Sequence, residues 1–68
     1  MDEVKEFIVI EEEEGDRLDV YLSEQLGDMS RSYIQKLIKD KKVTVNDKIE
    51  KAKYLVKEDD KIVIQIPA

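Results

Sequence analysis

The pattern of apolar and polar residues at the start of the chain predicts a strand followed by a helix. Residues 7–10 are an apolar and largely β-branched run, which favours a short strand, and the acidic run at residues 11–14 ends it. Residues 15–16 then break the chain, and the Asp16 carboxylate is the expected N-cap of a helix. Four apolar residues recur at helical spacing in that helix, namely Leu18, Tyr21, Leu22 and Leu26. Residues 27–28, a glycine and an aspartate, end it.

A second helix is predicted to begin after Ser30, whose hydroxyl can cap it. Its apolar residues share one side of a helical wheel: Tyr33, Ile34, Leu37 and Ile38. Its polar residues share the other side: Arg31, Ser32, Gln35, Lys36 and Lys39. One face of this helix can therefore be buried, while the other offers cations and hydrogen-bonding side chains to a ligand.

The C-terminal half of the chain predicts three strands joined by turns. Strands are expected at residues 43–45, 54–56 and 62–66, where β-branched and aromatic residues concentrate. Turns are expected at residues 46–47 and 58–60, because Asn and Asp tolerate left-handed backbone and bond to it locally. One strand, two helices and three strands make an α+β fold, with the two helices packed on a small, mainly antiparallel sheet.

The composition limits both the size of the core and the available chemistry. The 68 residues, 41% of them apolar, suffice for one small domain with a modest core. The absence of Cys and His excludes disulfides, Cys/His zinc sites and catalysis by either residue type. The longest apolar run, residues 7–10, is too short for a transmembrane helix, and no membrane partner is expected. A chain without Cys fits a reducing cytosol, so a cytoplasmic location is expected.

Charge is strongly segregated along the chain, although the net charge is −5. Residues 1–28 hold eleven acids and two bases, about −9, and residues 58–68 hold three acids and one base, about −2. Residues 29–57 hold nine bases and three acids, about +6. A concentrated basic surface is typical of proteins that bind a phosphate backbone. The predicted second helix and the strand after it therefore become the candidate RNA-binding segment.

Several motifs in this order resemble the S4 domain, also called the alpha-L RNA-binding domain. They are GDRLDVYL at residues 15–22, SRSYIQKLIKDKKVTVND at residues 30–47, a strand containing tyrosine, and an Asp turn before IVIQI at residues 62–66. The resemblance covers residues 15–66. The chain departs from the family at Asp47 and Asp59, where the family often has Gly. Asn and Asp can form both turns without Gly at modest cost.

The first part of the chain makes the resemblance more specific, because it is similar to the S4 domain of one enzyme family. FIVIEEEEGDRLD at residues 7–19 is similar to the N-terminal domain of the pseudouridine synthase family that modifies uridines in large-subunit ribosomal RNA. The implied organisation is a strand and acidic segment at residues 1–14 and an S4 core at residues 15–66. Residues 67–68 then begin a linker to a catalytic domain that the chain lacks.

The resemblance implies that the second helix and the hairpin after it form the RNA surface. The RNA-binding candidates are Ser30, Arg31, Ser32, Gln35, Lys36, Lys39, Lys41, Lys42, Asn46 and Lys48. The alternative is a solvated charged helix face, with lysines that protect an edge strand from aggregation. Three further lysines are left open between the two interpretations: Lys51, Lys53 and Lys57.

Other notable residues have structural interpretations. Arg17 is expected to pair with a nearby acid, and Asp19 lies in the first turn of its helix, where the macrodipole favours it. Tyr33 and Tyr54 could stack on bases, but core packing is the expectation for both. The acidic run at residues 11–14 is interpreted as a solvated strand end rather than a metal site.

No catalytic constellation is visible, so no activity and no cofactor are expected of this chain alone. The resemblance implies a parent RNA pseudouridine synthase, in which this module docks a ribosomal RNA stem-loop and tethers the catalytic domain. A freestanding ribosome-associated RNA-binding factor and an acidic protein-interaction module are the alternatives. No small-molecule substrate is expected, and a monomer is the default.

Overall fold

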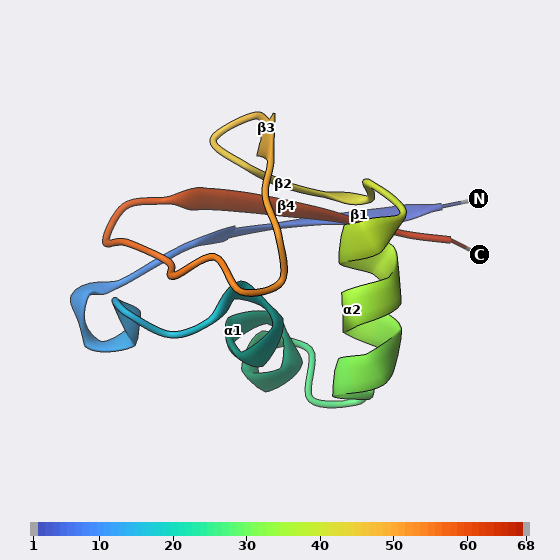
Figure 1. Ribbon diagram of the computed structural model, residues 1–68, viewed down its shortest axis with the longest axis horizontal. Helices are drawn as coiled ribbons and strands as arrows, with labels where there is room; N and C mark the ends of the chain where they lie inside the picture. Colours follow the sequence, from blue (N-terminus) through green and yellow to red (C-terminus); the bar gives the residue numbers. More distant parts are fainter. Residues whose placement is uncertain (1, 68) are drawn as a thin grey trace.

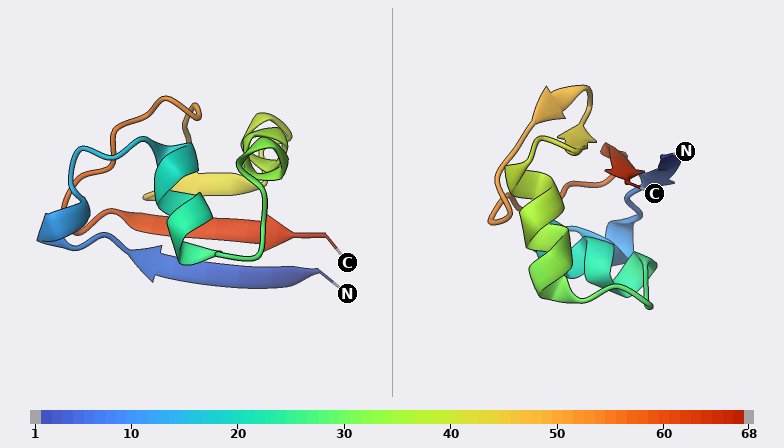
Figure 2. Two further views of the ribbon diagram at one scale, coloured as in Figure 1. Left: turned by 90° about the horizontal axis from the view of Figure 1, so that it is seen from below. Right: turned by 90° about the vertical axis from the view of Figure 1, so that its right-hand side faces the viewer.

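Four strands form one antiparallel sheet, and two helices lie together on one face of it (Figures 1 and 2). The computed structural model describes residues 2–67. The strand order is β1-β4-β2-β3, and all neighbouring strands are antiparallel. In chain order the elements are β1 (Glu3–Ile8), the 3-10 turn η1 (Glu11–Glu13), α1 (Leu18–Gln25), α2 (Arg31–Lys39), β2 (Val43–Val45), β3 (Lys48–Ile49) and β4 (Lys61–Ile66). The predicted α+β class and the antiparallel sheet are confirmed.

The core lies between the sheet and the helices. Alternate residues of β4, Ile62, Ile64 and Ile66, are buried, as the two-residue period of a strand requires. All four apolar residues at helical spacing in the first helix are buried: Leu18, Tyr21, Leu22 and Leu26. The second helix buries Ile34, Leu37 and Ile38. Hydrophobic periodicity thus identified the core-facing side of both helices.

The first strand lies earlier in the chain than predicted. The apolar run at residues 7–10 indicated a strand there, but β1 begins at Glu3 and ends at Ile8. The whole length of β1 pairs with β4, from Glu3 opposite Ile66 to Ile8 opposite Lys61. Most side chains of this edge strand are exposed, so backbone pairing rather than an apolar pattern defines its bounds. Residues 11–13, expected as a solvated strand end, form η1 instead.

The prediction of a strand at residues 54–56 is wrong. Leu55 makes only an isolated bridge to Arg17, and this segment runs beside the start of α1 instead of joining the sheet. The backbone N–H of Leu18 donates to the Tyr54 carbonyl at 2.7 Å. The N–H of Asp19 donates to the Ala52 carbonyl at 3.3 Å, and the two bonds satisfy donors at the start of the helix that have no partner within it. The expectation that Asp16 caps α1 is likewise wrong, because the N-cap is Arg17 and no side chain caps this end.

Both ends of α2 are fixed by local hydrogen bonds. The Ser30 Oγ accepts a hydrogen bond from a backbone N–H of the first turn at 3.1 Å, which confirms the predicted cap. At the other end, the N–H of Lys41 donates to the Ile38 carbonyl at 3.1 Å. The N–H of Lys42 donates to the Leu37 carbonyl at 2.9 Å, which completes a Schellman motif. No helix within residues 2–67 is long and apolar enough to cross a membrane.

The two predicted turns form without glycine. Asn46 and Asp47 have φ angles of 52° and 68° and join β2 to β3 through a two-residue loop, as in a type I′ hairpin. Asp59, in the turn at residues 58–60, has a φ of 71°. Asn and Asp enter this left-handed region at modest cost, as expected from the sequence. Lys41 also lies there, with a φ of 63°.

We expect Lys41→Gly to raise the free energy of unfolding by about 0.5–1 kcal/mol. A lysine with positive φ costs about 1–2 kcal/mol, more than the extra chain entropy that a glycine loses on folding. Lys36→Gly is the matched control, because it removes the same side chain within α2 and should lower stability by about 1 kcal/mol. Urea unfolding of both variants measures the difference. A destabilised Lys41→Gly would show that this left-handed residue carries no such cost.

Candidate nucleic-acid interface

The polar face of α2 is exposed along its whole length. All five polar residues assigned to it from the sequence are exposed: Arg31, Ser32, Gln35, Lys36 and Lys39. The predicted division of the helix into a buried and an open side is therefore confirmed. Tyr33 differs from the prediction of core packing, since 37% of its surface is exposed.

Asp19 of α1 is fully buried and holds two residues of the open face of α2. Its Oδ2 accepts hydrogen bonds from Gln35 Nε2 at 2.7 Å and from Arg31 Nε at 3.3 Å. Arg17 donates its Nε and Nη2 to the same carboxylate at 3.2 and 3.1 Å, which confirms its predicted pairing with a nearby acid. The contacts to α2 were not predicted, because these partners lie 12 and 16 residues away in the chain.

These contacts keep the Asp19 carboxyl ionised. Burial alone would raise its pKa, but hydrogen bonds from Gln35, Arg31 and the Val20 backbone outweigh burial. The charge of Arg17 adds to them, and the pKa falls below the usual value of 3.8. A fixed charge thus orients the side chains of Arg31 and Gln35 before a ligand arrives, which reduces the entropy lost on binding. The Arg31 side chain is still 52% exposed.

The remaining cations of the predicted surface form no ion pair with another residue of the described part of the chain. Lys36, Lys39, Lys41 and Lys48 are exposed, and Lys42 is half-buried. Within residues 2–67 both ion pairs are arginine contacts with the Asp19 carboxylate, so no lysine there is paired. The acidic turn η1 lies at the opposite end of the long axis from α2 (Figure 1). The separation in space is only partial, because the acidic strand β1 begins at the same end of the long axis as α2 (Figure 1).

The side chain of Asn46, another predicted RNA contact, forms hydrogen bonds within the protein. Its Nδ2 donates to Asp60 Oδ1 at 2.8 Å, and its Oδ1 accepts from the Lys61 backbone N–H at 2.9 Å. Asp60 is buried and also accepts from the Tyr54 hydroxyl at 2.6 Å and from the Lys57 N–H at 2.9 Å. The bond to Asp60, together with burial, raises the pKa of Tyr54 to about 12. This network fixes the hairpin turn, and an RNA contact of Asn46 stays a prediction.

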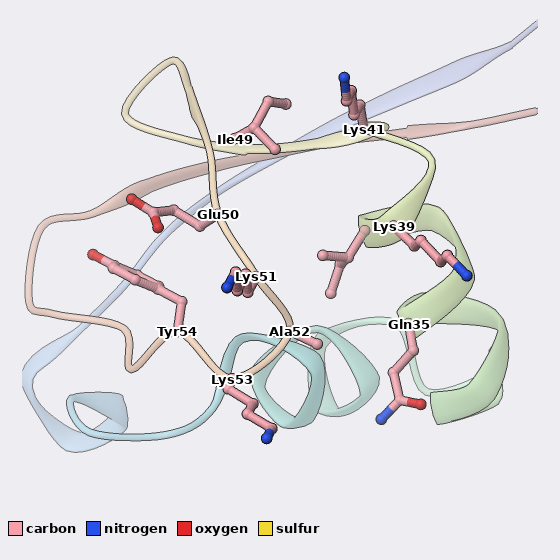
Figure 3. A pocket seen from close by; sticks show the side chains of 10 residues that line it. Gln35, Lys39, Lys41, Ile49, Glu50, Lys51, Ala52, Lys53 and Tyr54 are labelled. Atoms are coloured by element: carbon pink, nitrogen blue, oxygen red, sulfur yellow. The ribbon is translucent and has the colours of Figure 1, made fainter.

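An open groove of about 710 Å³ lies between α2 and the segment that follows β3 (Figure 3). Gln35, Lys39 and Lys41 of the predicted surface line it. The other candidates do not line this groove. The opposite wall contains residues absent from the predicted set: Ile49, Glu50, Lys51, Ala52, Lys53 and Tyr54. The sequence signals for this wall were the charges of Lys51 and Lys53 and the aromatic ring of Tyr54.

Tyr54 faces both the core and the groove. The half-buried residue packs against the hydrophobic core, which confirms the packing predicted for it, and it also lines the groove. Within residues 2–67, no group of three or more His, Cys, Asp or Glu side chains is arranged to hold a metal ion.

Comparisons with known proteins agree with this geometry. A family model of the S4 domain matches residues 16–62. An uncharacterized RNA pseudouridine synthase of Aquifex aeolicus (strain VF5) is 41% identical over 66 residues, which cover 96% of this chain and 20% of that protein. The uncharacterized RNA pseudouridine synthase YlyB of Bacillus subtilis (strain 168) is 33% identical over 57 residues, which cover 84% of this chain and 19% of that protein. The chain thus spans about a fifth of the length of these curated relatives.

We expect stability to fall in acid because of Asp19 and Asp60. Both carboxyls have a folded-state pKa below the usual 3.8, so their contribution is present above that pH and is lost as the pH falls through the folded-state values. Asp19→Asn should unfold about 1–3 kcal/mol more easily at pH 7, because its donors lose a charged partner, and should lose less stability on acidification. Urea unfolding at pH 7 and about pH 3 measures both effects.

The control for this experiment is Asp28→Asn, which changes an exposed aspartate after α1. Its free energy of unfolding should change between the two pH values by as much as that of the wild type. If Asp19→Asn lost as much unfolding free energy on acidification as the wild type, the role of Asp19 in acid stability would be contradicted.

Proposed function

This chain belongs to the S4 domain family, an RNA-binding fold, and on that premise we propose that it docks structured ribosomal RNA and positions an attached pseudouridine synthase domain. The observation that carries the proposal is the open face of α2. Asp19 orients Arg31 and Gln35 on this face, and the neighbouring lysines have no internal counter-ion within residues 2–67. Guanidinium and ammonium groups in this arrangement suit phosphates, and the Gln35 amide suits a base edge.

The proposed division of labour assigns recognition to this chain and uridine isomerisation to the remainder of a longer protein. The two relatives are named RNA pseudouridine synthases, and the chain corresponds to about a fifth of each. The two buried carboxylates, Asp19 and Asp60, are occupied by hydrogen bonds within the protein and are not offered to a substrate. We assign residues 15–66 to the RNA-binding core.

Tethering explains how a small domain can affect a reaction that it does not catalyse. An attached active site has an effective concentration near the bound RNA of the order of mM for a short flexible connection. Even weak docking then increases the time that the active site spends near its uridine. Selectivity would come from RNA shape and from unpaired bases, because the groove of an A-form duplex that carries most sequence information is too narrow for side chains.

The proposal predicts a strong salt dependence of RNA binding. If about four phosphates are neutralised, the logarithm of the affinity should fall with the logarithm of the salt concentration with a slope near −3. A chemical-shift titration with a ribosomal RNA stem-loop at two salt concentrations measures this slope and maps the surface. Shifts should concentrate between Ser30 and Lys48. An absence of shifts at low salt would contradict RNA docking and favour a protein-interaction module.

Removing cations from α2 tests the proposed surface directly. Arg31→Ala combined with Lys39→Ala should abolish most RNA binding, because two charged contacts are lost from the open face. Single substitutions provide a matched pair: Lys39→Ala should weaken binding several-fold, whereas Lys5→Ala, which removes the same charge from β1, should not. Circular dichroism checks that each variant is folded. Full affinity in the folded double variant would refute the proposed surface.

A further inference from the structure

The groove beside α2 combines an apolar floor with a cationic rim. Ile38, 4% exposed, and the half-buried Ala52 supply apolar surface from its two walls. Ile49 adds a side chain that is 50% exposed, although it belongs to the short edge strand β3. The Tyr54 ring also contributes, and the bond of its hydroxyl to Asp60 at 2.6 Å fixes its orientation. This floor is therefore largely preformed.

Four lysines and one acid line the same groove. Lys39 and Lys41 come from the α2 side, and Lys51 and Lys53 come from the opposite segment (Figure 3). Glu50 is the acid. The lining therefore carries a net charge of about +3, while its floor is apolar. This combination is complementary to a ligand with a flat apolar body and negative charge on both sides.

We propose that this groove receives one unpaired base of the bound RNA, with the flanking phosphates on the rim lysines. The inference rests on the proposed function, since it assigns a subsite of the same RNA surface. The groove volume of about 710 Å³ lies within the roughly 300–1,000 Å³ typical of sites for small organic ligands. Unpaired bases commonly stack on aromatic and apolar side chains, whereas a paired base presents no free face to such a floor.

Gln35 supplies a polar group at one edge of the groove. Its Nε2 donates to Asp19 at 2.7 Å, which fixes the orientation of the amide. The other end, Oε1, is an acceptor that suits the N–H groups on the edge of a base. The buried carboxylate that orients the open face of α2 thereby also orients the polar edge of the groove.

The test compares two RNAs that differ in one nucleotide. One is a stem with a single bulged 2-aminopurine, a fluorescent base whose emission reports stacking, and the other is the same stem fully paired. The chain should bind the bulged RNA about tenfold more tightly than the paired RNA, and the emission should change on binding. Ile49→Ala should reduce this preference to less than about threefold without changing the affinity for the paired stem.

The matched control is Ile8→Ala, which removes the same atoms from an isoleucine on β1 that is 51% exposed, against 50% for Ile49. It should retain the wild-type preference. If Ile49→Ala does not fold, Lys51→Glu replaces it, because this exposed residue changes the charge of the rim. The replacement should weaken binding of the bulged RNA more than binding of the paired stem.

The outcomes separate this inference from the proposed function. Equal, salt-dependent affinity for the two RNAs with unchanged emission would show that RNA docks without placing a base in the groove. Binding of neither RNA would overturn the inference and the proposed function together. Binding of a polyglutamate peptide in place of RNA would assign the groove to an acidic protein segment and overturn both.

Discussion

The Asp19 carboxylate lies buried between the two helices, where it joins Arg17 at the start of α1 to Arg31 and Gln35 of α2. A buried charge without partners is very costly, so this contact constrains how the two helices can pack. The carboxylate reaches residues whose outer atoms are exposed, and it thereby links the core to the surface. The geometry of the candidate RNA surface depends on it, because α2 itself contains no acid that could orient its cations.

Asp60 has the same role for the hairpin and the segment after it. It accepts hydrogen bonds from Asn46, Tyr54 and the Lys57 backbone, which belong to three different turns or loops. A domain of 68 residues has a limited apolar core, to which this segment contributes Val56, with Ala52 and Tyr54 packed against it. Two buried carboxylates with satisfied hydrogen bonds add directional contacts to this packing. They also determine the two walls of the groove.

The distribution of charge connects this architecture to function. The acidic turn η1 lies far from the basic α2 along the long axis, although the acidic start of β1 lies at the same end as α2 (Figure 1). The net charge of −5 therefore hides a local basic surface on α2. Phosphates attracted to α2 would meet an arginine and a glutamine that Asp19 orients, with exposed lysines around them. An ordered centre with a cationic rim suits recognition of RNA shape together with one or two exposed bases. The chemistry of uridine isomerisation lies, in our proposal, in the remainder of a longer chain.

The sequence alone determined the two helices, their buried faces and the Ser30 cap. It also determined the glycine-free turns and two strands, at residues 43–45 and 61–66, with bounds correct to within one residue. Each of these depends on residues close together in the chain, where periodicity and capping operate. It did not determine the bounds of β1, because this edge strand is defined by hydrogen bonds to β4, more than fifty residues away. Nor did it reveal that residues 54–56 run beside α1, that Asp19 holds Arg31 and Gln35, or that Ile49 and Tyr54 share a groove with α2. The tertiary structure decided these features, because they depend on which distant segments come into contact. A local pattern predicts only which side of each segment is buried.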